Sequence, residues 1–116
     1  AKRDGVSLAA ALGGTRAMVM AGVSLGIEPS IDALLAEVDE QVAAGYPRVK
    51  TKIAPGWDVA AVRAVRAAHP DLDLHVDANG AYLPGDDSTG IFQELDRLGL
   101  TMIEQPFGAR DFAAHA

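Results

Sequence analysis

Four short apolar segments recur along the sequence at nearly constant spacing, and each is followed by a segment with helical periodicity. The apolar segments end at Ser24, Lys52, Asp77 and Glu104, each 25 to 28 residues after the previous one. Regular alternation of short strands and helices predicts right-handed βαβ units in a parallel sheet. Two α/β architectures have this pattern, namely an open, doubly wound sheet and part of a (β/α)8 barrel.

Capping residues and glycine or proline stops predict where the individual elements begin and end. Ser30 and Asp58 are candidate N-caps, and Gly45 and Gly99 are candidate helix stops. The expected strands cover residues 17–25, 48–53, 72–76 and 100–103. The expected helices lie within 1–16, 30–45, 58–69 and 88–99, with a further helix that begins near Asp111.

The first strand lacks a glycine-rich phosphate motif, which disfavours a nucleotide-binding open sheet. Gly22-Val23-Ser24-Leu25-Gly26 contains glycines, but their spacing differs from G-x-G-x-x-G. Both α/β architectures remain open from the pattern alone.

Composition excludes several other classes of protein. The 116 residues predict a single domain, and a net charge of −6 argues against a broad nucleic-acid-binding surface. No apolar run reaches the roughly 18 residues needed to span a membrane. The sequence contains no cysteine, so it has no disulfide framework or thiolate metal site, and we expect a cytoplasmic protein.

Charged and polar residues collect at the predicted carboxyl ends of three strands. In parallel α/β folds these ends carry the functional site. Asp77 and Glu104, on neighbouring strands, would supply the hard oxygen ligands that suit Mg²⁺ or Mn²⁺. The alternative is that each acidic residue merely caps the next helix, and the occurrence of charges at three strand ends argues against it.

Lys50 and Lys52 suggest the chemistry of this site. Residues two apart in a strand point to the same face, and two adjacent ammonium groups lower each other's proton affinity, which suits a general base. A divalent cation held by Asp77 and Glu104 can bind a substrate carboxylate and stabilise the enediolate formed by α-proton removal. We therefore predict metal-dependent α-proton chemistry with a lysine base.

Other polar residues are predicted to have structural roles. Arg48, Asp73 and His75 share the strand parity of the candidate site residues, so we expect a stabilising polar contact among them below the catalytic level. Arg63 and Arg66 are expected to lie on a solvated helix face.

Three motifs resemble signatures of the enolase superfamily. They are Lys50 to Asp58 (KTKIAPGWD), Val76 to Asn79 (VDAN) and Ile103 to Pro106 (IEQP). They are similar to the muconate lactonizing enzyme-like branch that contains o-succinylbenzoate synthase and N-acylamino acid (N-succinylamino acid) racemase. Residues 5–16 and 22–27 also resemble this branch, so the similarity covers nearly the whole chain.

The resemblance implies a role for each candidate site residue. Lys52 would be the acid/base lysine of the K-x-K motif, and Lys50 would assist it through charge. Asp77 and Glu104 would be two of three carboxylates that bind Mg²⁺ or Mn²⁺. Three further positions, expected to contact substrate or to support the metal ligands, are Asn79, Gln105 and Ser24.

The resemblance also implies an architecture. Residues 1–16 would be the end of a capping region or linker helix, and residues 17–116 the first four β/α units of the barrel. The N-terminal capping domain and the C-terminal half of the barrel would be missing, together with the third carboxylate and a second catalytic lysine. We therefore expect a partial chain of a longer enzyme, inactive by itself.

Two catalytic outcomes fit these motifs, since both pass through the same enediolate. Dehydration to o-succinylbenzoate in menaquinone biosynthesis is the favoured prediction, and racemisation of N-acylamino acids is the alternative. A third hypothesis is a non-catalytic half-barrel that dimerises or binds a partner. For the enzyme we expect a small-molecule carboxylate as substrate and a homo-oligomer in the full-length form.

Overall fold

A four-stranded parallel sheet forms the centre of the chain. The computed structural model describes residues 1–116, apart from the side chain of Asp86. The sheet has the strand order β1-β2-β3-β4, which is also the order along the chain, and every neighbouring pair is parallel. The strands are β1 (Gly22–Leu25), β2 (Arg48–Lys52), β3 (Asp73–Asp77) and β4 (Met102–Glu104).

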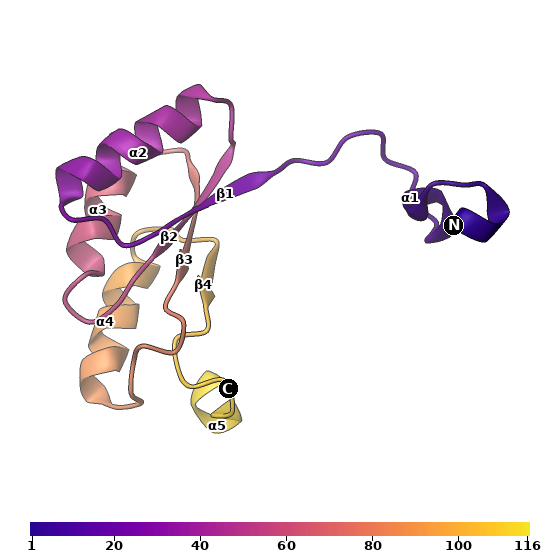
Figure 1. Ribbon diagram of the computed structural model, residues 1–116. Helices are drawn as coiled ribbons and strands as arrows, with labels where there is room; N and C mark the ends of the chain where they lie inside the picture. Colours follow the sequence, from indigo (N-terminus) through magenta and orange to yellow (C-terminus); the bar gives the residue numbers. More distant parts are fainter.

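Three helices connect the strands and lie on the same side of the sheet (Figure 1). They are α2 (Ile31–Ala43), α3 (Val59–Ala68) and α4 (Asp86–Asp96). A doubly wound sheet reverses its strand order and carries helices on both faces, whereas a (β/α)8 barrel keeps its order and places every helix outside. The arrangement therefore confirms the prediction of part of a barrel.

Alternate residues of the strands face opposite environments. We call the side packed against α2, α3 and α4 the covered face; in the two central strands it carries Val49, Thr51, Leu74 and Val76, all fully or almost fully buried. The residues of opposite parity form the open face, which carries Arg48, Lys50, Lys52, Asp73, His75 and Asp77. The fully buried helix residues Leu34, Val38, Val62, Val65 and Leu95 complete the core.

Both predicted N-caps are confirmed. The Ser30 hydroxyl accepts a hydrogen bond of 3.1 Å from the Ala33 backbone N–H, and Asp58 Oδ1 accepts one of 2.7 Å from Val59. The other carboxylate oxygen of Asp58 accepts a 3.2 Å hydrogen bond from the Tyr82 hydroxyl. Burial and the nearby Asp58 charge raise the pKa of Tyr82, so the phenol stays protonated and links α3 to the loop after β3.

The predictions for the first 21 residues are largely wrong, whereas residues 22–25 form a strand as predicted. Helical structure within residues 1–16 is limited to the 3-10 turn η1 (Lys2–Asp4) and to α1 (Leu8–Ala11), and the strand begins at Gly22 rather than at residue 17. Gly22 pairs with Arg48, the first residue of β2, so the apolar residues before it have no neighbouring strand. Met18 is 88% exposed, and the segment extends away from the sheet (Figure 1).

Arg66 corrects another prediction, because it does not lie on a solvated face. Its guanidinium donates hydrogen bonds to five backbone carbonyls, at 2.9 Å to Leu98, 3.0 Å to Gly99 and 2.8 Å to Leu72, with His69 and Pro70 as the others. These carbonyls follow α3 and α4, so the side chain ties together the two connections that lead into β3 and β4. Arg63 pairs with Glu94 and is exposed, as predicted.

The last element is α5 (Phe112–His115), which begins after Asp111 as expected. The boundaries of α3, β3 and β4 lie within one or two residues of the predicted ones, whereas α4 ends at Asp96, three residues before the predicted stop at Gly99. Among the described residues, none of the helices combines the length and the apolar character needed to cross a membrane.

Candidate active site

The open face arranges its side chains in three rows, because register partners on parallel strands lie side by side. The upper row, at the carboxyl ends of the strands, holds Lys52, Asp77 and Glu104. The middle row holds Ser24, Lys50, His75 and Met102, and the lower row holds Gly22, Arg48 and Asp73.

Asp77 is the most buried member of the upper row. Its Oδ1 accepts a 2.9 Å hydrogen bond from the backbone N–H of Asn79, which fixes the orientation of the carboxylate. Its Oδ2 lies 3.7 Å from Nζ of Lys50 and 3.8 Å from Nζ of Lys52. One carboxylate oxygen therefore faces both ammonium groups.

Lys50 reaches from the middle row to the upper row and crosses β3 to Glu104. Its Nζ donates a 2.5 Å hydrogen bond to Glu104 Oε2. This hydrogen bond, assisted by the charges of Glu104 and Asp77 and opposed by burial, raises the pKa of Lys50 above its usual value. The prediction of a lowered proton affinity is therefore wrong for Lys50, because the two carboxylates outweigh the neighbouring ammonium.

Lys52 has different partners. Its ammonium donates to the side-chain oxygen of Asn79 and approaches Asp77, and its side chain is 40% exposed against 26% for Lys50. The more accessible amine at the end of β2 is thus Lys52. The structure brings Asn79 together with Lys52 and Asp77.

Asn79, two residues after β3, and Gln105, directly after β4, both adopt left-handed backbone conformations, with φ of 47° and 41°. Such angles are costly for residues other than glycine and concentrate at functional sites. Gly80 follows Asn79, and its N–H donates to the Gln105 carbonyl at 2.7 Å. A Cβ at Gly80 would meet the Phe107 carbonyl oxygen at 3.1 Å. Gln105 thus joins the loops at the rim, and no described hydrogen bond connects its side chain to the carboxylates.

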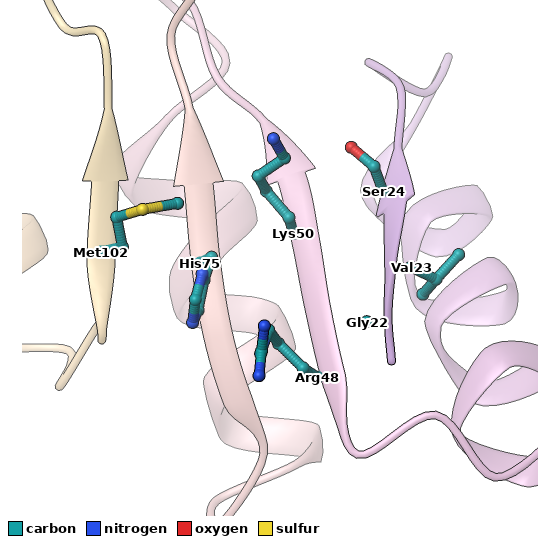
Figure 2. Close-up of a pocket in the computed structure, with 7 residues that line it drawn as sticks. All are labelled: Gly22, Val23, Ser24, Arg48, Lys50, His75 and Met102. Carbon is teal, nitrogen blue, oxygen red and sulfur yellow. The ribbon is translucent and has the colours of Figure 1, made fainter. Parts of the chain in front are cut away.

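Ser24 lies opposite Lys50 in the register and lines the same cavity of about 320 Å³. Figure 2 shows that this cavity lies over β1 to β4 at the level of the middle and lower rows, with Arg48, Lys50 and His75 around it. Ser24 is thus placed beside the site, on the strand farthest from Glu104.

The predicted contact among Arg48, Asp73 and His75 is confirmed. Asp73 Oδ2 accepts from Arg48 Nε at 2.9 Å, and its Oδ1 lies 3.0 Å from His75 Nε2. Sequence reasoning missed Thr101, whose hydroxyl donates a 2.7 Å hydrogen bond to Oδ1; its place just before β4 is the only signal. The Thr101, Arg48 and His75 contacts lower the pKa of Asp73.

Asp77 and Glu104 suit a divalent cation. They are register partners that present carboxylate oxygens at the ends of adjacent strands, and such oxygens are the ligands that Mg²⁺ and Mn²⁺ prefer. The Lys50 ammonium between them shows that both carboxylates converge on a positive charge. Among the described residues, no third carboxylate or imidazole joins this pair to complete a metal-binding cluster.

Comparison with known proteins covers most of the chain. Residues 33–116 match a protein family described as enolase C-terminal domain-like. A relative named o-succinylbenzoate synthase from Geobacillus kaustophilus is 52% identical over 116 residues, which cover 100% of this chain and 30% of the relative. A relative named N-succinylamino acid racemase from Thermus thermophilus is 44% identical over 116 residues, covering 100% of this chain and 31% of the relative.

Solved structures agree with the sequence relatives. A crystal structure of a member of the enolase superfamily from Listeria innocua superposes with a TM-score of 0.93 at 44% identity, and the match covers 99% of this chain and 30% of that one. The chain thus spans about 30% of the length of the relatives that it matches.

Proposed function

Because the chain belongs to the enolase C-terminal domain-like family, we propose that it supplies part of the active site of an enzyme that removes the α-proton of a carboxylate substrate. One observation carries the proposal, namely the convergence of two lysines and two carboxylates at the carboxyl ends of β2, β3 and β4. In a barrel of this type, that rim is where the chemistry takes place.

Lys52 is the proposed acid/base residue. It lies at the end of β2, its side chain is the more exposed of the two lysines, and it is not bound to Glu104. Once deprotonated, its amine can take the α-proton of a substrate held above the upper row and return a proton later. Asn79, which contacts both Lys52 and Asp77, orients the lysine. Ser24, in the middle row of the open face, and Gln105, at the rim, are proposed to contact the substrate.

Asp77 and Glu104 are the proposed ligands of Mg²⁺ or Mn²⁺. When bound there, the cation supplies the positive charge that stabilises an enediolate. The Asn79 N–H holds Asp77 Oδ1, so Oδ2 remains directed at the site. Lys50 adds a further positive charge next to both carboxylates.

The preferred reaction is the dehydration that yields o-succinylbenzoate, a step in menaquinone biosynthesis. Its support is the 52% identity to a relative of that name over the whole chain. Racemisation of N-succinylamino acids is the second candidate, because a relative with that name is 44% identical over the same length. Cytoplasmic location and a homo-oligomeric full-length form stay predictions.

The test uses the complete natural protein with Mg²⁺ or Mn²⁺ and both kinds of substrate. We expect loss of water from the hydroxylated precursor of o-succinylbenzoate, detected by absorbance and mass spectrometry. In D2O, an N-succinylamino acid would exchange its α-hydrogen if racemisation also occurs. Turnover of neither substrate, with no α-hydrogen exchange, would contradict the proposed reaction.

A further inference from the structure

The Lys50 ammonium lies between the carboxylates of Asp77 and Glu104. Its Nζ lies 2.5 Å from Glu104 Oε2 and 3.7 Å from Asp77 Oδ2. Charged hydrogen bonds of this kind are the strong ones in proteins. The ammonium therefore compensates both carboxylates at once.

This contact requires Lys50 to leave its own row. Its register partners are Ser24 and His75, so a side chain perpendicular to the sheet would lie over the middle row. Instead it reaches the upper row and crosses β3 to a residue on β4. Lys52 begins in the upper row, directly opposite Asp77, and yet its closest partner is Asn79.

We propose that Lys50 is an internal counter-cation that holds Asp77 and Glu104 together before a divalent cation binds, and that it leaves Glu104 when the cation arrives. The inference rests on the proposed function, because it takes these two residues as metal ligands. An ammonium hydrogen and a divalent cation compete for the same lone pairs of Glu104. The two also repel each other, so both cannot stay at the shortest distance.

Two consequences follow, and they have opposite signs. Removal of the Lys50 charge leaves Glu104 without this ammonium partner and Asp77 with Lys52 alone, which destabilises the protein free of divalent cations. The same removal frees Glu104 and deletes a repulsive charge, so divalent cations bind more tightly. A lysine whose ammonium did not contact these two carboxylates would produce neither effect at this size.

The experiment measures Mn²⁺ binding to the complete natural protein by calorimetry, without substrate. Lys50→Met is expected to lower the Mn²⁺ dissociation constant about tenfold or more, because a nearby repulsive charge is removed. Lys50→Arg, which keeps a cation, is expected to bind like the native protein. The matched control is Arg48→Met, on the same strand and face but paired with Asp73, and it should change the constant less than about threefold.

A thermal scan in chelator and in excess Mn²⁺ gives a second measurement. Lys50→Met should melt below the native protein in chelator and recover most of the difference in Mn²⁺. An unchanged or weaker affinity for Mn²⁺ in this variant would overturn the inference, and so would equal tightening by Arg48→Met.

Two further measurements keep the test decisive if Lys50→Met fails to fold or if the proposed metal site does not bind Mn²⁺. In the native protein, Mn²⁺ should speed acetylation of the Lys50 amine, followed by mass spectrometry; an unchanged rate argues against release from Glu104. If neither the native protein nor any variant binds Mn²⁺, the proposed metal site is wrong and this inference fails with it. If the native protein binds Mn²⁺ but Lys50→Met does not bind it more tightly, only this inference fails.

Discussion

The two faces of the same four strands are held by different forces. On the covered face, Val49, Leu74 and Val76 are fully buried against three helices, and apolar burial stabilises them. On the open face, Lys50, Lys52 and Asp77 lie one residue away along the same strands and are held by ion pairs and hydrogen bonds. Because strand residues alternate, neighbouring positions take unrelated roles.

This difference indicates that the covered face supplies most of the folding energy and that the open face carries the residues of the candidate site. Isolated ion pairs in partly exposed positions contribute little to folding, whereas each buried leucine or valine contributes about 1.5–3 kcal/mol relative to exposure. The open face can therefore carry like charges side by side because the covered face supplies the folding energy. Substitutions on the two faces should separate activity from stability.

The largest expected effect is on catalysis, from Lys52→Met. In the complete protein, we expect the turnover rate to fall by about 10³-fold because the proposed base is removed. The melting temperature should change little, since the side chain is 40% exposed. Arg63→Met, which removes an exposed charge from a helix, is the control and should keep full activity. Near-native turnover by Lys52→Met would assign the base to another residue.

Leu74→Ala tests the covered face, where we expect a loss of stability without a loss of turnover. Leu74 is fully buried in β3, and its truncation should lower the free energy of unfolding by about 2–5 kcal/mol. Turnover per folded molecule should stay close to native, because the side chain points away from the site. Denaturant unfolding measures the loss, and Leu83→Ala, at an exposed position, should cost much less. A loss of turnover in Leu74→Ala with unchanged stability would contradict the claim that the covered face contributes to folding and not to catalysis.

The sequence predicted the fold well where local chemistry and packing act together. Ser30 and Asp58 supply their own cap hydrogen bonds, so the starts of α2 and α3 follow directly from residue type. The first 21 residues were predicted poorly because an apolar run forms a strand only beside another strand, and β2 begins opposite Gly22. Arg66 was missed because its five carbonyl partners come together only in the folded chain.

The sequence was enough to predict which residues belong to the candidate site, but not which of their side chains contact one another. Strand parity alone is enough to place Lys50, Lys52 and Asp77 on one face of the sheet. Parity does not say which lysine contacts which carboxylate, and the Lys50 to Glu104 hydrogen bond skips a strand. The raised pKa of Lys50 depends on that contact and could not be predicted from the K-x-K spacing alone.

Asp73→Asn tests whether the lower row of the open face is structural, in contrast to the upper row, which carries the candidate site residues. Its pKa is lowered in the fold, so its charge stabilises the protein above the usual value of 3.8, and this contribution is lost as pH falls through the lower, folded value. Since the side chain is 38% exposed, solvent screening limits the loss at pH 7 to about 1 kcal/mol or less.

Urea unfolding between pH 7 and pH 3 measures the effect of Asp73→Asn. The difference from the native protein should be largest near neutral pH and should shrink as pH falls below about 4. Asp71→Asn, two residues earlier and exposed, is the control and should change the free energy of unfolding at pH 7 less than Asp73→Asn does. A gap that widens in acid would contradict the sign of the pKa shift.

Thr51→Val replaces a hydroxyl with a methyl group and is the only one of these substitutions expected to stabilise the fold. Thr51 lies on the covered face between the two lysines, and among the described residues its buried Oγ1 has no hydrogen-bond partner. A buried hydroxyl without a partner costs free energy, so valine should raise the free energy of unfolding by about 1 kcal/mol. Thr101→Val makes the same chemical change where the hydroxyl donates to Asp73, and it should destabilise instead. If denaturant unfolding shows both variants destabilised, the covered face contains a polar contact at Thr51 and is not held by apolar packing alone.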